Sequence, residues 1–217
     1  ICVGNIYLGG TGKTPTSIFL AVELTNLGFK PVIIRKYYEE QKDEHNLIKN
    51  YFTDLILCTN RELGIKEAEK KGFNVVILDD GLQDYKIKKN LSIACFNQKQ
   101  LIGNGQVLPS GPLRESLSAL KNTDLILING DKVPDFEKRL LKINKNLKIY
   151  YSHYEPINIE QFKNHNLIAI AGIANPENFF TLLEKNNLNI KEKLIFPDHY
   201  RFTKNQIQNI IKNAKDK

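Results

Sequence analysis

Residues 1–15 read ICVGNIYLGGTGKTP, and this stretch decides the fold. An apolar run typical of a buried strand meets a glycine-rich turn that ends in GKT at residues 12–14. Turns of this kind surround phosphate oxygens with backbone N–H groups, and the helix that follows points its positive end at them. The strict pattern G-x-x-x-x-G-K-[ST] has glycine where Tyr7 stands, so Gly9 and Gly10 must supply the flexibility instead.

The turn is therefore predicted to bind the phosphates of a nucleotide. Lys13 would reach the β- and γ-phosphates, and the Thr14 hydroxyl would hold Mg²⁺. The alternative is a strand-to-helix turn that is rich in glycine but binds no ligand. The predicted nucleotide-binding residues are Gly9, Gly10, Thr11, Gly12, Lys13 and Thr14.

The composition favours an acidic partner. The chain has 217 residues, a formal net charge of +7 and a sequence pI of about 9.1. Such a balance suits nucleotides, nucleic acid or an anionic membrane surface, although a solubilising lysine-rich surface gives the same charge. The basic residues are scattered and no nucleic-acid-binding motif is present, so nucleic acid is not predicted as a partner.

The three cysteines and the chain ends give expectations about the compartment. Cys2, Cys58 and Cys95 each lie in an apolar run, which predicts three buried, reduced thiols in a cytosolic protein. No segment reaches the roughly 18 apolar residues of a membrane span. The sequence has no Met and begins in a strand, so we expect it to be a piece of a longer protein.

Strands and helices alternate along the chain, which predicts a three-layer α/β/α domain with a mostly parallel sheet. We expect this phosphate-loop domain at 1–151, a linker at 152–165, and a smaller, incomplete α/β domain at 166–217. Because ligands bind beyond the carboxyl ends of parallel strands, the glycine-rich turn, the acidic pair at 79–80 and the Gly/Pro-rich loop 103–117 can converge on one cleft. The expected strands of the first domain cover 1–8, 31–34, 54–58, 74–78, 91–96, 124–128 and 147–151, and the expected helices cover 14–27, 47–52, 61–71 and 136–143.

Asp79 and Asp80 follow a strongly apolar strand. A phosphate-loop NTPase needs an acidic residue at this position to hold Mg²⁺, directly or through water. Two adjacent aspartates at the end of a buried strand repel each other unless a cation or hydrogen bonds offset the repulsion. We therefore predict a metal role for both, against the alternative of a solvated Asp-Gly turn.

Three further residues are candidates for the chemistry. The polar stretch 36–46 is expected to be a loop that carries Asp43, and His199 lies in a second polar stretch; together they could form a carboxylate–imidazole pair that takes the proton of an acceptor hydroxyl. Arg114 follows a rigid Pro/Gly segment and could stabilise transferred charge on phosphate. The alternatives are a solvated loop, a structural histidine and a structural salt bridge.

Taken in order, the motifs resemble the tetraacyldisaccharide 4′-kinase family of lipid A biosynthesis. The segment GNGQVLPSGPLRE is far more specific than the glycine-rich turn, and the resemblance covers nearly the whole chain. The segments that carry it are VGN and GGTGKTP within 3–15, DDGLQ at 79–83, GNGQVLPSGPLRE at 103–115, AGIANPENFF at 171–180 and FPDHY at 196–200.

The resemblance implies an ATP- and Mg²⁺-dependent kinase that phosphorylates the 4′-hydroxyl of an acylated glucosamine disaccharide 1-phosphate. It implies a protein that lies peripherally at the cytoplasmic face of the inner membrane of a Gram-negative bacterium. We expect a monomer. The family's hydrophobic N-terminal helix has no counterpart in the sequence. Carried over residue by residue, the catalytic residues are Asp43, His199, Lys13 and Arg114, and the metal residues are Thr14, Asp79, Asp80 and Glu115.

The sequence departs from the family pattern on the acceptor side. The family has Ser-Arg-Gly-Tyr-Gly after the second strand, whereas Arg35 is followed here by residues 36–38, KYY. The stretch from there to Asp43 is short, and Asp84 stands where the family has histidine. The acceptor loop is therefore expected to be trimmed.

Three other functions would require different residues at these positions. A partition- or Min-type ATPase switch would carry lysine directly before the Gly-Gly pair, where Leu8 stands. A GTPase would carry Asn-Lys-x-Asp after a late strand, and residues 129–131 lack that lysine. A passive anion-binding module at a membrane would gain nothing from carboxylates beside phosphate, so the acidic pair at 79–80 argues against it.

Overall fold

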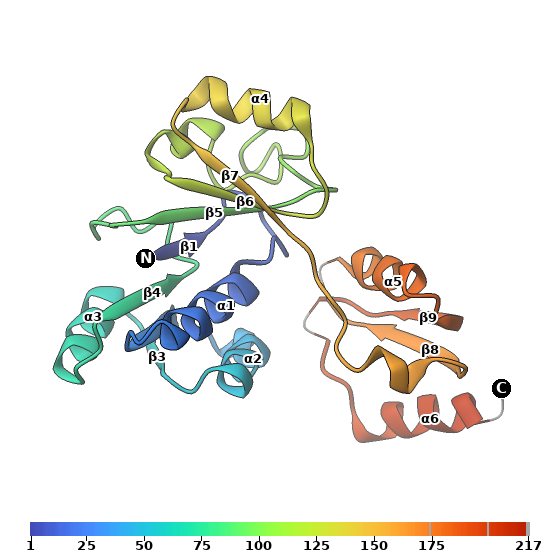
Figure 1. Cartoon of the computed structure of the whole chain (residues 1–217). Helices are drawn as coiled ribbons and strands as arrows, with labels where there is room; N and C mark the ends of the chain where they lie inside the picture. The colour runs from blue at the N-terminus through green and yellow to red at the C-terminus, as the bar shows by residue number, and fades with distance from the viewer. Residues whose placement is uncertain (174, 199, 216–217) are drawn as a thin grey trace. The chain divides into compact units, whose positions relative to one another are not determined.

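The computed structural model describes residues 1–173, 175–198 and 200–215. The chain divides into two compact units, Ile1–His153 and Tyr154–Lys217. Both units are built from parallel strands joined by helices (Figure 1), so the predicted α/β class is confirmed. No helix within the described residues has the length and apolar character needed to cross a bilayer.

The first unit is a seven-stranded parallel sheet in the order β3-β2-β4-β1-β5-β6-β7 (Figure 1). Its strands are β1 (Cys2–Gly4), β2 (Pro31–Lys36), β3 (Leu55–Cys58), β4 (Val75–Asp79), β5 (Ser92–Asn97), β6 (Leu125–Asn129) and β7 (Lys148–Ser152). Its helices are α1 (Lys13–Asn26), α2 (Lys42–Tyr51), α3 (Arg61–Lys70) and α4 (Pro134–Ile143), with short 3-10 turns at Glu39–Gln41 and Leu117–Asn122.

Alternate residues of each strand face opposite sides of the sheet, and both faces are covered. Val32 and Ile34 of β2 belong to the larger core cluster, whereas Ile33 between them belongs to the smaller one. Burial on both faces explains why the central strands of this parallel sheet are near-continuous apolar runs, such as residues 75–78 of β4.

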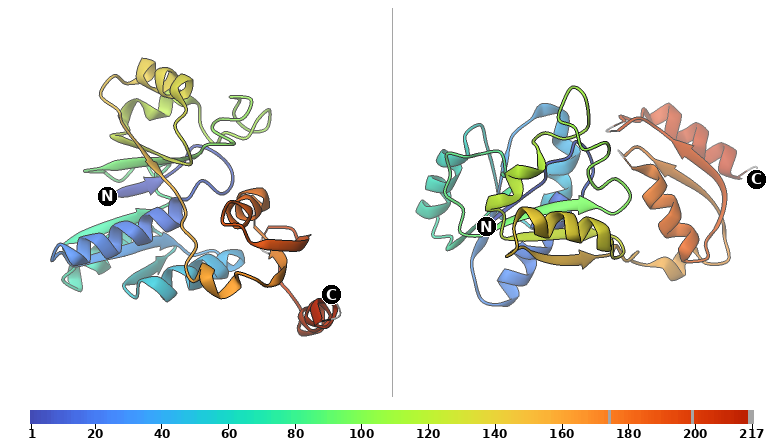
Figure 2. Two further views of the ribbon diagram at one scale, coloured as in Figure 1. Left: turned by 45° about the vertical axis from the view of Figure 1, so that its right-hand side comes forward. Right: turned by 90° about the horizontal axis from the view of Figure 1, so that it is seen from above.

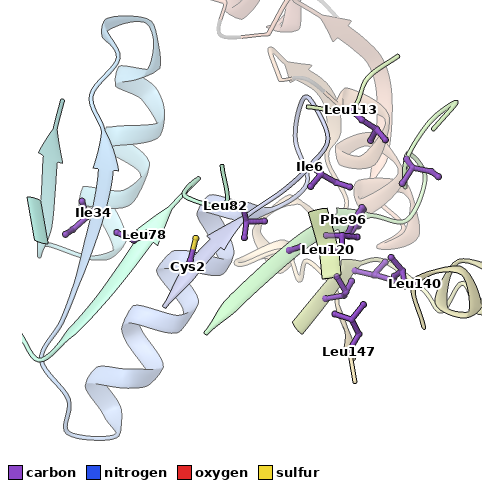
Figure 3. Packing of buried hydrophobic residues seen from close by; sticks show 14 of the residues in the cluster. Cys2, Ile6, Ile34, Leu78, Leu82, Phe96, Leu113, Leu120, Leu140 and Leu147 are labelled. Carbon is purple, nitrogen blue, oxygen red and sulfur yellow. The ribbon is translucent and has the colours of Figure 1, made fainter. Parts of the chain in front are cut away.

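Different helices cover the two faces. Ala68 of α3 and Phe136 of α4 pack into the larger cluster, and Figure 3 shows this cluster running from Ile34 past Phe96. Ala21 of α1 and Ile48 of α2 pack into the smaller cluster on the other face. The unit is therefore a three-layer α/β/α sandwich, as its alternating strand and helix patterns predict.

The order of the strands gathers the polar segments at one edge of the sheet. β1 lies between β4 and β5, and Val3 is paired with Asp79. Because all of these strands are parallel, the turn after β1, the two aspartates at the end of β4 and the segment after β2 lie at the same carboxyl edge. Ligands bind outside this edge in open α/β sheets.

The second unit is small. Strands β8 (Asn166–Ala171) and β9 (Asn189–Ile195) are parallel and are connected through α5 (Pro176–Lys185). Phe180 is fully buried against Ala169 and Ala171. A 3-10 turn at Ile159–Phe162 precedes β8, and helix α6 (Lys204–Lys215) follows β9.

Two local expectations are wrong and one element is missed. The stretch 36–46 is not a loop throughout, because α2 begins at Lys42; acidic side chains in its first turn favour a helix N-terminus, and Ile48 anchors it to the core. Cys58 is only half-buried, because β3 is the edge strand. Helix α6 had no predicted counterpart.

Candidate active site

The glycine-rich turn between β1 and α1 depends on glycine at two positions. Gly9 and Gly12 have φ values of 110° and 88°, which side-chain-bearing residues rarely adopt. The buried amide of Asn5 donates from Nδ2 to Thr11 Oγ1 at 2.8 Å and to the Gly9 carbonyl oxygen at 3.4 Å. The turn is therefore held from inside by the residue that follows β1.

The helix that leaves this turn presents unsatisfied N–H groups. Gly12 is the N-cap residue of α1, and within the described residues no side chain caps this end and no acidic residue lies in the first turn. The first N–H groups of a helix have no intrahelical partner, and the helix dipole makes this end positive. A phosphate group fits this position both electrostatically and as a hydrogen-bond acceptor.

Asp79 forms the buried centre of the site. Its carboxylate accepts hydrogen bonds from the Thr14 hydroxyl at 3.2 Å and the Ser17 hydroxyl at 2.9 Å, and it forms an ion pair with Arg35. Arg35 also donates to Thr14 Oγ1 at 3.0 Å. The hydroxyl and carboxylate that hold Mg²⁺ in phosphate-loop enzymes are thus already in contact.

Asp80 lies beside the cations of the site. Its backbone has a φ of 54°, in the left-handed region, and Arg61 Nη2 donates to the carbonyl oxygens of Asp79 and Asp80 at 2.9 and 2.5 Å. Arg114 Nη1 donates to both carboxylate oxygens of Asp80 at 2.9 and 3.0 Å, and Lys13 Nζ lies 4.0 Å from Oδ1. The strained backbone of Asp80 is therefore held in place by Arg61 at its carbonyl oxygen and by Arg114 at its carboxylate.

Lys13 and Asp80 are coupled electrostatically. Burial alone would raise the pKa of Asp80, but Lys13 and Arg114 outweigh burial and the pKa is lowered. Burial lowers the pKa of Lys13, and Asp80 works in the opposite direction. Each group therefore supports the charged form of the other.

Arg35 connects this cluster to helix α2. Its guanidinium is buried; Nη2 donates to Gln41 Oε1 at 2.9 Å and forms an ion pair with Glu44. Asp43, the residue before Glu44, is exposed in the first turn of α2. The predicted base is therefore carried by a helix that one arginine connects to Asp79.

The Gly/Pro-rich loop 103–117 also reaches the site. The Leu8 N–H donates to the Pro112 carbonyl oxygen at 2.8 Å, and the Arg114 N–H donates to the Ile6 carbonyl oxygen at 2.7 Å. Figure 2 shows this loop beside the turn that follows β1. The structure thus brings the glycine-rich turn, Asp80 and Arg114 together.

Glu115 has partners within the protein. It accepts from Gln83 Nε2 at 3.1 Å and from the Tyr85 hydroxyl. Among the residues described, no group of three or more His, Cys, Asp or Glu side chains is arranged to hold a metal ion. A Mg²⁺ ion would therefore rely on the Thr14 hydroxyl, phosphate oxygens and water besides the aspartates, and the metal role of Glu115 stays a prediction.

His199 lies outside the described residues, so its pairing with Asp43 stays a prediction. Sequence reasoning missed several polar residues that organise the site. Arg35 and Arg61 are buried cations, and Ser17 lies one helical turn after Thr14. Arg35 directly follows the apolar residues of β2, and a charged residue in that position is a signal for a buried, functional side chain. The missed residues are Asn5, Ser17, Arg35, Arg61 and Gln83.

The strand–turn–helix unit, the buried aspartate in contact with Thr14 and the cations beside Asp80 define an α/β phosphate-loop protein of the phosphotransferase type. The chain belongs to the family described as tetraacyldisaccharide-1-P 4′-kinase, whose model matches residues 1–217. It is therefore a member of a kinase family, and an ATPase switch is not favoured.

Curated relatives agree with the family. The chain is 41% identical to the tetraacyldisaccharide 4′-kinase of Pelagibacter ubique, over 99% of this chain and 69% of the relative. It is 34% identical to the protein of the same name from Francisella tularensis subsp. novicida, over 97% of this chain and 74% of the relative. The chain is also 34% identical to the Haemophilus influenzae protein of that name, over 98% of this chain and 69% of the relative.

Proposed function

We propose that the protein transfers the γ-phosphoryl group of ATP to the 4′-hydroxyl of an acylated glucosamine disaccharide 1-phosphate, a step of lipid A biosynthesis. The observation that carries the proposal is the contact of Thr14 with Asp79, beside the cluster of Lys13, Asp80 and Arg114. Kinase catalysis consists mainly of positioning and charge stabilisation, and this cluster offers both.

On the donor side, the N–H groups at the start of α1 and Lys13 bind the phosphates. Thr14, Asp79 and Asp80 would hold Mg²⁺, with Glu115 as a further acidic group, and the ion would supply positive charge beside the phosphates. Arg114 holds Asp80 in place and stabilises charge on the transferred group.

On the acceptor side, Asp43 takes the proton of the 4′-hydroxyl as that oxygen attacks phosphorus, and His199 orients and tunes the carboxylate. Glu44, the next residue along α2, forms an ion pair with Arg35, which in turn contacts Asp79. This connection supports a base held at a fixed place relative to the donor phosphates. Proton removal and phosphoryl transfer then occur in one pre-arranged site.

The acceptor is a lipid, so we propose that the protein works peripherally at the cytoplasmic face of the inner membrane, as a monomer. The net charge of +7 supports attraction to an anionic surface.

The test is incubation of the protein with ATP, Mg²⁺ and the acylated disaccharide 1-phosphate, followed by mass spectrometry and ³¹P NMR of the lipid. The proposal predicts a product with a second phosphate monoester at the 4′ position, and none when Mg²⁺ is chelated. A lipid left unchanged by an ATP-binding preparation would refute it.

A further inference from the structure

A polar cavity of about 480 Å³ opens beside Asp80, at the carboxyl ends of β2, β3 and β4. Its lining side chains are all polar, charged or aromatic, and five are basic and three acidic. Gln41, Thr59 and Gln83 line it together with the charged groups. Such a lining suits sugar hydroxyls and phosphate, and none of the lining side chains is an aliphatic one that would suit an acyl chain.

One end of the cavity adjoins the phosphoryl donor. Asp80 and Arg114 line it, and both belong to the cluster around Lys13. Arg35 and Gln41 also line it, and they connect Asp79 to the helix that carries Asp43. A sugar held in this cavity is therefore close to both the transferred phosphoryl group and the predicted base.

The basic residues of the cavity differ in how they are neutralised. Arg35 is paired with Asp79 and Glu44, Arg114 is paired with Asp80, and Arg61 lies 3.6 Å from Asp84. These pairs account for the acidic residues near the donor end. Two further basic residues of the lining have no acidic partner among the described residues.

Lys36 and Lys86 are those two cations. Lys36 is the last residue of β2, and Lys86 lies in the segment that follows the aspartate pair. No described residue forms an ion pair with either lysine, although both line a cavity whose other cations are paired. Arg61, which also lines the cavity, has a buried Nε atom without an acceptor among the described residues.

We infer that this cavity binds the sugar headgroup of the acceptor and that Lys36 and Lys86 hold its existing phosphate, the 1-phosphate. The inference rests on the proposed function. Two ammonium groups with no carboxylate partner match a phosphate monoester, and the description of the matched family includes a 1-phosphate.

The test compares two acceptors, the acylated disaccharide with its 1-phosphate and the same disaccharide without it. Lys36→Gln and Lys86→Gln, singly and together, remove charge while keeping side-chain length. The double variant is expected to raise KM for the phosphorylated acceptor about ten- to hundredfold, the range for lost charged hydrogen bonds. KM for the dephosphorylated acceptor and for ATP is expected to change less than about twofold, and Arg at both positions is expected to restore most of the affinity.

Lys88→Gln is the matched control, because Lys88 is exposed two residues after Lys86 and does not line the cavity. Binding of both acceptors to nucleotide-free protein, measured by calorimetry, must show the same preference and the same loss in the double variant. The subsite is wrong, and the kinase proposal stands, if the wild-type protein transfers phosphate and the double variant prefers the 1-phosphate acceptor over the dephosphorylated one as strongly as the wild type does. If the wild-type protein phosphorylates neither acceptor, both proposals fall.

Discussion

The donor side and the acceptor side of the candidate site are built in opposite ways. On the donor side, Asp79 is fully buried and has three partners from two different elements. On the acceptor side, Asp43 is exposed in the first turn of a ten-residue helix. A nucleotide has the same phosphates in every reaction and can be met by a rigid site, whereas an acceptor lipid must enter and leave. The difference predicts that donor-side changes damage nucleotide binding, chemistry and fold together, and that acceptor-side changes leave ATP binding intact and damage only turnover or acceptor binding.

The largest effect is expected from Lys13→Ala. This substitution removes the cation from the phosphate loop and leaves Asp80 with Arg114. We expect kcat/KM for ATP to fall by about 10³-fold or more, because a positioned charge on a transferred phosphoryl group is worth at least that much.

The measurement is initial-rate kinetics with ATP as the varied substrate. Lys30→Ala, at an exposed position before β2, is the control and should retain full activity. Normal turnover in Lys13→Ala would remove the loop from the mechanism.

Asp43→Asn tests the acceptor side. Loss of a general base should lower kcat by roughly 10²–10⁴-fold, while KM for ATP stays unchanged. The free energy of unfolding should fall by no more than about 1 kcal/mol, the usual value of a charge at a helix N-terminus. The exposed residue Glu40 offers a control as Glu40→Gln, in the turn just before α2. An unchanged kcat would assign the proton transfer to another group.

Arg35→Met tests the connection between the two sides. It leaves the buried carboxylate of Asp79 without its cation, and breaking a buried pair in this way costs about 3–5 kcal/mol of the free energy of unfolding. Urea denaturation measures the loss. Arg35→Lys should restore part of it, and the exposed Arg139→Met should cost less than about 0.5 kcal/mol. Equal stability of Arg35→Met and the wild type would mean that Asp79 needs no counterion.

The smallest effect concerns His45 of α2. Burial, and then the charge of Arg35, lower the pKa of His45, whose ring stacks on Tyr37 at 5.4 Å between centroids. A histidine with a lowered folded-state pKa is protonated more readily in the unfolded chain, so stability falls as the pH drops below about 6.5 and is complete above it.

Urea denaturation between pH 5 and pH 8 measures this dependence. His45→Gln should flatten the profile within that window, whatever it does to the stability at pH 8. An equally steep profile in His45→Gln would assign the pH dependence to other groups.

The two sides also differ in how far the sequence predicts them. The glycine-rich turn is a contiguous pattern whose meaning depends on neighbouring residues, and Lys13 and Thr14 could be found directly. The partners of Asp79 come from positions far away in the chain; Arg35 is 44 residues distant. Nothing local indicates such a contact, since it depends on the strand order that places β4 beside β2.

Helix α2 shows a second limit. Its first residues are polar, and the helical periodicity begins only near Leu47, so the start of the helix was predicted too late. Packing of Ile48 against the sheet and the bond from Arg35 to Glu44 hold the first turn in place. Tertiary contacts of this kind override local sequence preference.

The most direct test of the account follows the γ-phosphoryl group of labelled ATP and measures which fraction reaches the 4′-hydroxyl of the disaccharide and which fraction becomes inorganic phosphate. The account predicts transfer to the lipid, little hydrolysis without acceptor, and loss of transfer in both Lys13→Ala and Asp43→Asn. Steady release of inorganic phosphate with no label on the lipid would contradict it.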